Sequence, residues 1–221
     1  MKIVKPSFEI LDEIDGHRML KKIERAGRTC YQSFDRTSFD SHMRFAQMLI
    51  DSGHESVLEH EKVTVRIVCD RGVSHELVRH RIASFSQEST RYCNYGGKDI
   101  EYIEPCYLVN KSLSDYLVWY NGCKHSEDSY NSMISMGRLP QECRAILPNS
   151  LKTEIVVTAN LREWRTILKQ RCSAKAHPQF REISIPLLLA FRQLVPVVFD
   201  DIEYDTKFEY GCAEWIKKES A

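Results

Sequence analysis

Apolar residues recur at helical spacing in several parts of the chain. Over residues 17–30, Leu20 and Ile23 belong to a stripe repeating every three or four positions, which predicts an amphipathic helix. The same spacing predicts further helices over residues 40–51, 114–136, 141–147, 161–172 and from about 178 onward. Ser52-Gly53 is expected to end the helix that begins at residue 40.

The pattern becomes alternating at residues 63–69, where Val65 and Ile67 are apolar, and this predicts a strand. A turn at residues 70–72 should follow, and a helix of about a dozen residues should begin near Val73. Other strands are predicted over residues 1–11, 100–103 and 153–158. Because the strands are few and do not alternate regularly with helices, the pattern favours an α+β fold. We expect a single domain over residues 1–221, with several helices packed on a small mixed or antiparallel sheet.

Length and charge narrow the possible functions. The chain has 221 residues, with 31 Lys plus Arg and 31 Asp plus Glu, so its formal net charge is zero. A nucleic-acid binder usually carries a basic excess, so no nucleic-acid partner is expected. With 43% hydrophobic residues and only 9 Gly and 7 Pro, the composition argues against disordered and low-complexity chains.

Compartment and membrane association are predicted from what the sequence does not contain. No stretch approaches the roughly 20 apolar residues of a membrane-spanning helix, so no membrane association is expected. The first residues turn acidic too early for a secretory signal. The eight cysteines include no Cys-x-x-Cys pair, which predicts reduced thiols in a cytoplasmic protein and no metal site.

Phosphate recognition, if present, must come from side chains. Neither a G-x-G-x-x-G after a strand nor a Walker loop occurs, so the glycine-rich loops of common nucleotide-binding folds are missing. Between Lys62 and Lys98 the chain has five arginines and no lysine, with hydroxyl residues among them. Arginine binds phosphates and carboxylates bidentately, so this segment suits a phosphorylated small molecule.

Arg81 is the unusual position of the helix predicted from Val73. On a helical wheel from Val73 to Ala83, Arg81 lies within the apolar arc. A buried guanidinium without a partner is very costly. Arg81 should therefore meet either a carboxylate of the protein or a ligand, such as a phosphate or the edge of a flavin ring.

Two further polar segments leave alternatives open. In HESVLEH, residues 54–60, a metal hydrolase centre could use His54, Glu59 and His60 together with His75, although the spacing is not that of H-E-x-x-H. The same segment also fits a polar helix start or a ligand contact. The basic helix over 161–172, with Asn160 as its cap, is either a solvated face or a ligand-binding one.

Arg79-His80-Arg81, followed after seven residues by Ser89, is the R-H-R-x7-S signature of the flavin-dependent thymidylate synthases. The chain also resembles this family in GHESVLEH at 53–60 and in LPNSLKTEIVVTANLREW at 147–164, with Arg171 and His177 downstream. AGRTCYQS at 26–33 is a weaker match. The resemblance implies a non-Rossmann flavin-binding fold and a homotetramer with active sites at subunit interfaces.

The resemblance also implies an activity, the reductive methylation of dUMP to dTMP. Methylenetetrahydrofolate would donate the carbon, and NADPH would be the reductant through FAD. Arg171 is the implied catalytic residue, which would polarise dUMP, a role that suits a permanently charged side chain. The other substrate-binding residues implied are Glu76, Arg79, Gln87, Glu88, Ser89, Thr90, Arg91 and Glu154. The residues implied for FAD are His54, Ser56, Arg79, His80, Arg81, Gln87, Asn160, Leu161, Arg162 and Thr166.

Some of these positions, including Glu76, Gln87, Glu154 and Thr166, depart from patterns seen in some family members. A carboxylate that faces a phosphate is unfavourable, so Glu154 is expected to meet an arginine or the ribose instead. The alternative class is a nucleotide- or RNA-binding module without catalysis. It predicts binding with a steep salt dependence and without a flavin.

Overall fold

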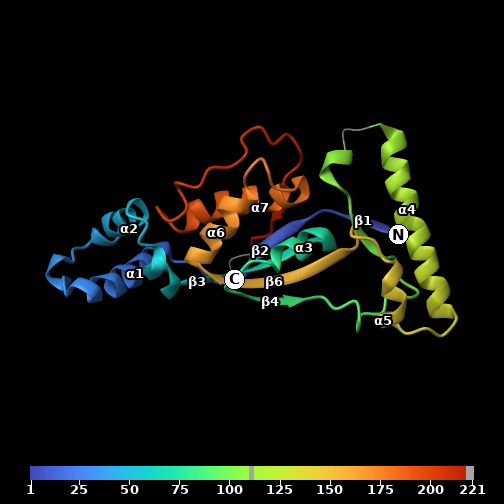
Figure 1. Ribbon diagram of the computed structural model, residues 1–221, viewed down its shortest axis with the longest axis horizontal. Helices are drawn as coiled ribbons and strands as arrows, with labels where there is room; N and C mark the ends of the chain where they lie inside the picture. The colour runs from blue at the N-terminus through green and yellow to red at the C-terminus, as the bar shows by residue number, and fades with distance from the viewer. Residues whose placement is uncertain (110–111, 218–221) are drawn as a thin grey trace.

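The computed structural model describes residues 1–109 and 112–217 and is organised around a five-stranded sheet (Figure 1). The strand order is β4 (Ala83–Gln87), β6 (Lys152–Asn160), β3 (Lys62–Asp70), β2 (Ser7–Ile10) and β7 (Glu214–Trp215). All neighbouring pairs are antiparallel except β2 and β7, which are parallel. The predicted α+β class with a small mixed sheet is confirmed.

The two longest strands form the centre of this sheet. β3 and β6 pair over nine residues, with Val65 opposite Val157 and Ile67 opposite Ile155. These four side chains are buried, whereas their neighbours along each strand are only partly buried. One face of the sheet therefore packs into the core, as alternation with a period of two requires.

Three helices cover this buried face: α3 (Arg71–Leu77), α6 (Leu161–Arg171) and α7 (Pro178–Leu194). Trp164 of α6 is fully buried, donates from Nε1 to the carbonyl oxygen of Val63 at 2.9 Å, and packs edge-on against Phe191 of α7. These contacts fix α6 between the sheet and α7. The position of α6 matters because most candidate functional residues lie on or beside it.

An arm extends from one end of the sheet (Figure 1). It comprises α1 (Gly16–Tyr31), η1 (Phe34–Arg36), α2 (Ser41–Asp51) and η2 (Glu55–His60). Asp15 caps α1 by accepting a hydrogen bond from the backbone N–H of Arg18 at 2.9 Å. Gly27 lets the two helices approach closely, because a Cβ there would lie 2.6 Å from the ring of Phe45.

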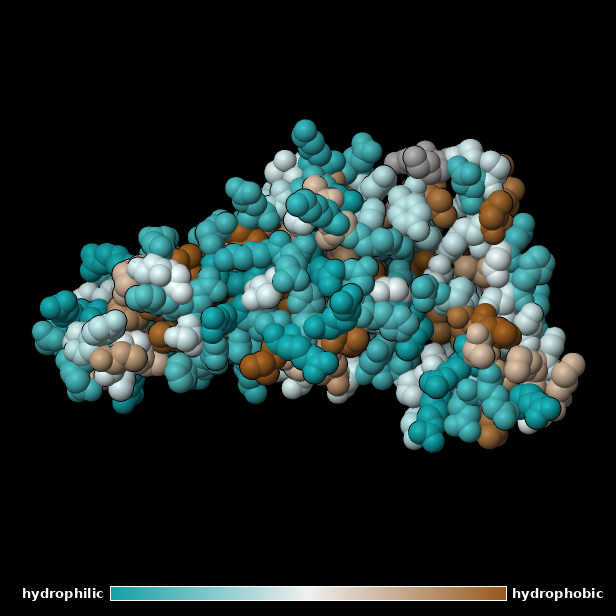
Figure 2. All heavy atoms as spheres, in the orientation of Figure 1, coloured by the Kyte–Doolittle hydropathy of each residue, from teal (hydrophilic) through white to brown (hydrophobic). Residues whose placement is uncertain are grey.

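The opposite end contains α4 (Leu113–Ser135), α5 (Pro140–Cys143) and η4 (Arg144–Ile146). Here β1 (Lys2–Val4) pairs in parallel with β5 (Glu101–Ile103), followed by η3 (Cys106–Leu108). A second, smaller core around Tyr102 and Tyr130 holds this end together. Figure 2 shows apolar side chains at the surface over this end, and Leu113, Val118 and Met136 are among the exposed ones.

Two sequence predictions are wrong in detail. The single strand predicted over residues 1–11 is two strands, β1 and β2, which belong to different sheets. They are separated by Lys5-Pro6, where the proline has no backbone N–H to donate. The helix predicted to begin near Val73 is α3, which begins at Arg71 and ends at Leu77. Its start is fixed by Asp70, which accepts a hydrogen bond from the backbone N–H of Val73 at 2.7 Å.

The remaining predicted helices are found within a few residues of their expected bounds. The short helix predicted over 141–147 is divided into α5 and η4. None of the helices in residues 1–109 and 112–217 combines the length and apolar character needed to cross a bilayer.

Candidate active site

A hollow of about 530 Å³ opens between the end of α3 and the exposed face of α6. This volume lies within the range of pockets that hold small molecules. Its lining is mostly charged and polar: Arg79, His80, Arg81, Glu163, Thr166, Gln170 and Arg171. The structure thus brings together five residues predicted from the sequence, drawn from two segments about 90 positions apart in the chain.

Arg171 is held from several sides at the end of α6. Its Nε donates to Nε2 of His80 at 3.0 Å. Its Nη1 donates to Oε2 of Glu76 at 2.5 Å, and its Nη2 donates to the carbonyl oxygen of Glu76 at 3.2 Å. The guanidinium also lies over the ring of Phe180, 4.8 Å from the ring centroid. Arg171 is therefore oriented before any ligand binds.

His80 is buried, and its contacts define its protonation. Burial, followed by the charges of Arg171 and Arg79, lowers the pKa of His80 to about 4. Because Nε2 accepts from Arg171, the neutral ring must carry its proton on Nδ1. That nitrogen lies 3.8 Å from Oε1 of Glu163, a buried oxygen without a hydrogen-bond partner among the described residues.

Arg79 and Arg81 lie in the segment between α3 and β4, and both are exposed. Within residues 1–109 and 112–217, neither guanidinium has a carboxylate within ion-pair distance. The prediction that Arg81 is buried on a helix is wrong, because α3 ends four residues before it. Of the two alternatives for Arg81, the structure shows no internal carboxylate and leaves its donors available to a ligand.

The start of α6 lies beside η2. Asn160 caps α6 by accepting a hydrogen bond from the backbone N–H of Glu163 at 2.8 Å, as expected from the sequence. Arg162 donates to Oε1 of Glu59 on η2 at 2.6 Å. The backbone N–H of Leu161 donates to the carbonyl oxygen of Glu61 at 2.9 Å. Its side chain is fully buried and therefore contributes packing rather than a ligand contact.

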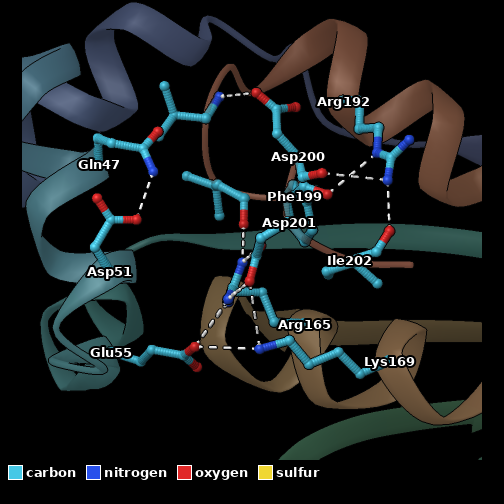
Figure 3. A network of polar contacts seen from close by, with 12 residues as sticks. Gln47, Asp51, Glu55, Arg165, Lys169, Arg192, Phe199, Asp200, Asp201 and Ile202 are labelled. Atoms are coloured by element: carbon cyan, nitrogen blue, oxygen red, sulfur yellow. Dashed lines mark hydrogen bonds and ion pairs between the residues drawn. The ribbon is translucent and has the colours of Figure 1, made fainter.

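His54 and Ser56 flank Glu55 at the beginning of η2, and both are exposed. Glu55 is engaged with α6: it accepts hydrogen bonds from Nε and Nη2 of Arg165 at 3.1 and 2.9 Å (Figure 3). Burial alone would raise the pKa of Glu55, but the hydrogen bonds and charges of Arg165 and Lys169 outweigh it and lower that pKa. The two segments implied for FAD are thus neighbours, although about 100 residues separate them.

A second group of predicted residues lies at the other end of β4. Gln87 donates to the hydroxyl oxygens of Ser74 at 2.8 Å and Thr153 at 3.2 Å. Glu88 accepts from the hydroxyl of Tyr95 at 2.8 Å. The remaining members are Ser89, which accepts from the backbone N–H of Arg91 at 3.3 Å, the buried Thr90, and Arg91, whose Nε donates to Gln141 at 3.1 Å.

Glu154 belongs to this second group and meets an arginine, as one of the two expectations stated. It accepts hydrogen bonds from Arg66 on β3, at 3.0 Å from Nε, and from Lys152 at 2.7 Å. Burial would raise the pKa of Glu154, but these two cations outweigh it and lower that pKa. Glu154 is therefore an ionised member of a salt-bridge network across the sheet.

The two groups do not form one pocket within the chain. They lie at opposite ends of β4, which begins at Ala83 and ends at Gln87. A strand rises about 3.3 Å per residue, so this strand alone separates them by roughly 13 Å. A ligand that contacts the hollow cannot also lie directly against Ser89 without reaching along the strand.

Comparison with known proteins identifies the family. Residues 11–197 match the family model described as thymidylate synthase complementing protein. The flavin-dependent thymidylate synthase of Corynebacterium efficiens is 31% identical over 219 residues, covering 91% of this chain and 86% of the relative. The chain belongs to the flavin-dependent thymidylate synthase family. The flavin-dependent thymidylate synthase of Mycolicibacterium gilvum is 33% identical over 215 residues, covering 90% of this chain and 84% of that relative.

A protein of lower sequence identity has a solved structure with the same fold. It is the UMP/dUMP methylase PolB of Streptomyces cacaoi, bound with 5-Br dUMP. Its TM-score is 0.75 at 21% identity, and the match covers 90% of this chain and 96% of that one. The likeness supports the fold. The predicted family, its enzyme class of methyltransferases and its dependence on a flavin are confirmed at the level of the family.

The alternative of a metal hydrolase centre at His54, Glu59, His60 and His75 is not supported by the positions of these side chains. In the described part of the chain, no group of three His, Cys, Asp or Glu side chains is placed to hold a metal. Glu59, which that alternative would use as a ligand, instead pairs with Arg162. His60 and His75 are exposed side chains of different elements, η2 and α3.

Sequence reasoning missed several residues of this site. Glu163 and Gln170 line the hollow with Thr166, and Phe180 supports Arg171 from α7. A helical wheel over residues 161–171 would have found the first two, because they lie three and four positions from Thr166 on one face. No signal in the sequence pointed to Phe180, since its contact depends on how α6 and α7 pack.

Proposed function

We propose that this protein methylates dUMP at C5 to form dTMP, with methylenetetrahydrofolate as carbon donor and NADPH as reductant through FAD. The observation that carries the proposal is the cationic hollow in which Arg171 is oriented by Glu76 and His80. Family membership supports the same reaction class.

The residues present fit FAD. Arg79 and Arg81 are exposed guanidiniums without a carboxylate partner among the described residues, and phosphates or ring carbonyl oxygens would supply acceptors. His54 and Ser56 at the beginning of η2, with Asn160, Arg162 and Thr166 at and beyond the start of α6, would complete the cofactor site with His80. Leu161 would support this site by packing, and Gln87, at the other end of β4, would reach the cofactor from another subunit. When bound, FAD would take a hydride from NADPH and deliver reducing equivalents to the transferred carbon.

Arg171 has the chemistry needed to activate the substrate. Attack by C5 of the pyrimidine requires electron density on the ring, and the negative charge that develops on the ring oxygens needs fixed donors. A guanidinium stays charged at any working pH, and that of Arg171 is already oriented by His80. Glu76 occupies two of its donors in this structure, so dUMP would have to replace Glu76 or share Arg171 with it.

The second group suits the phosphate of the nucleotide. Ser89, Thr90 and Arg91 would bind it, and Glu88 and Glu154 would contribute through the polar network around them. Because β4 keeps this group away from Arg171 in one chain, a complete dUMP site would combine the two groups from different subunits. The exposed apolar side chains over α4 offer a surface for subunit contacts, which the proposed homotetramer would require.

The activity is tested directly by release of tritium from dUMP labelled at C5, in the presence of NADPH and methylenetetrahydrofolate. The purified protein should be yellow or should become so with added FAD. Arg171→Ala should abolish turnover and leave FAD bound. A colourless protein that does not bind added FAD, or near-normal turnover of Arg171→Ala, would contradict the proposal.

A further inference from the structure

Two ion pairs hold η2 against α6. Glu55 and Glu59, four residues apart on η2, face Arg165 and Arg162, three residues apart on α6. The shortest N–O distances are 2.9 Å for Glu55 with Arg165 and 2.6 Å for Glu59 with Arg162. Both pairs therefore join the two elements that carry the residues proposed to bind FAD.

The two pairs differ in burial. The side chain of Arg165 is 1% exposed and that of Glu55 is 20% exposed, whereas Arg162 and Glu59 are 49% and 43% exposed. Exposed pairs contribute little, because water and mobile side chains compete with them. A buried guanidinium depends on its partners, because losing one leaves its charge uncompensated. The Glu55–Arg165 pair is therefore the stronger of the two connections.

Arg165 is itself fixed from the opposite side (Figure 3). Its Nη1 and Nη2 donate to Oδ1 and Oδ2 of Asp201 at 2.6 and 2.8 Å, and Nη1 also donates to the carbonyl oxygen of Val198. This bidentate contact orients the guanidinium independently of Glu55. The donors that face Glu55 consequently have a defined position, and Lys169 adds a weaker contact to the same carboxylate at 3.4 Å.

η2 is a six-residue 3-10 helix, a geometry with poor hydrogen bonds. Leu58, which is fully buried, anchors the middle of η2, and backbone hydrogen bonds hold the two ends of this segment, from the N–H of His54 to Leu49 and from the N–H of Leu161 to Glu61. At the exposed beginning of η2, Glu55 is the side chain that joins it to α6. His54 and Ser56 lie on either side of Glu55 and are exposed. We propose that Arg165 is a positioning residue that acts through Glu55, keeping His54 and Ser56 in a fixed arrangement with α6 before FAD binds. This role rests on the proposed function.

Two substitutions separate positioning from general stability. Glu55→Gln and Asp201→Asn each neutralise one carboxylate that pairs with the buried guanidinium of Arg165, and each preserves the size of the side chain. The FAD dissociation constant of each apoprotein is measured by quenching of flavin fluorescence, and its thermal midpoint gives the structural effect. Both variants should have a lower midpoint. Glu55→Gln should raise the dissociation constant roughly tenfold, because it weakens the link between η2 and α6. Asp201→Asn should raise it by less than about twofold, because the amide oxygen that remains and the carbonyl oxygen of Val198 still accept from Nη1 and keep the guanidinium facing Glu55.

Hydrogen exchange at the backbone amides of residues 55–60 adds a readout that needs no flavin: it should accelerate in Glu55→Gln and stay unchanged in Asp201→Asn. Should Glu55→Gln fail to fold, Glu55→Asp keeps the charge but shortens the side chain, and the same comparison applies. Unchanged FAD affinity at Glu55, or an equal loss in Asp201→Asn, would overturn the positioning role alone. An unsubstituted protein that binds no FAD would overturn the proposed function together with this role.

Discussion

Nε of Arg171 donates to Nε2 of His80 at 3.0 Å, although 91 positions separate the two residues in the chain. A guanidinium only donates, so this contact requires a neutral His80 with its proton on Nδ1. Burial and the nearby charges of Arg171 and Arg79 maintain that state by lowering the pKa of His80 to about 4. The orientation of the proposed catalytic arginine therefore depends on the protonation of its neighbour.

The first prediction concerns pH. The pKa of His80 is about 4 in the folded protein against 6.5 for the unperturbed group, so between these values the unfolded chain binds a proton that the folded one does not. The stabilisation is complete above about pH 6.5 and is lost as the pH falls toward 4. In urea unfolding at about pH 7 and about pH 5, His80→Gln should show a smaller difference in the free energy of unfolding than the unsubstituted protein.

Part of the pH dependence should persist in His80→Gln. His42 is also buried, and burial followed by the charge of His17 lowers its pKa in the same direction. The substituted glutamine can still accept from Arg171 through its amide oxygen, so the fold should be retained. A pH dependence identical to that of the unsubstituted protein would show that His80 does not titrate as its environment indicates.

The second prediction concerns the competition for Arg171. The carboxylate of Glu76 occupies Nη1 of this guanidinium, whereas Nη2 donates to the backbone carbonyl oxygen of Glu76, and a neutral amide is a weaker acceptor than a carboxylate. Glu76→Gln should therefore free Nη1 for the pyrimidine and lower the dissociation constant of dUMP by roughly threefold. Equilibrium binding of dUMP to the FAD-loaded protein measures this effect. Weaker dUMP binding would mean that Glu76 orients Arg171 for the substrate rather than competing with it.

The third prediction compares two exposed arginines. Arg81 lines the hollow, whereas Arg138 lies in the turn between α4 and α5. Arg81→Ala should raise the dissociation constant of FAD about tenfold, because it removes donors from the proposed cofactor site. Arg138→Ala removes the same charge elsewhere and should change it by less than about twofold. Equal losses in both would indicate an effect of net charge rather than a contact at Arg81.

The sequence predicted which segments carry the site but not how they meet. The hydrophobic pattern located β3, β6 and α6, because long strands and helices have strong periodicity. It missed β4, whose five residues alternate too briefly to stand out and whose form depends on pairing with β6. That omission extended the preceding helix and placed Arg81 on an apolar face. An edge strand takes its structure from its neighbour, which no local pattern records.

Contacts between side chains that are far apart in the chain could not be predicted from the hydrophobic pattern either. The motifs named Arg171, His80 and Glu76 separately, but their mutual hydrogen bonds depend on α6 returning over the sheet to the end of α3. The buried position of Arg165 was predicted neither by periodicity nor by motif. On a helical wheel it belongs to a basic helix, and its burial follows from Glu55 and Asp201, which lie in other elements.

The last prediction tests the packing of the arm on the core. Gly16 begins α1 against the end of α7, where a Cβ would meet the carbonyl oxygen of Leu194 and lie 2.8 Å from Cδ of Pro196. Backbone and proline-ring atoms cannot swing aside, so Gly16→Ala should lower the free energy of unfolding by about 2 kcal/mol or more. Gly122 provides the control, because it lies inside α4 with open space around its Cα. Gly122→Ala should raise the free energy of unfolding by about 0.5–1 kcal/mol, since alanine favours a helix. Urea denaturation of both variants measures the difference, and a Gly16→Ala protein as stable as Gly122→Ala would contradict the contact between α1 and α7.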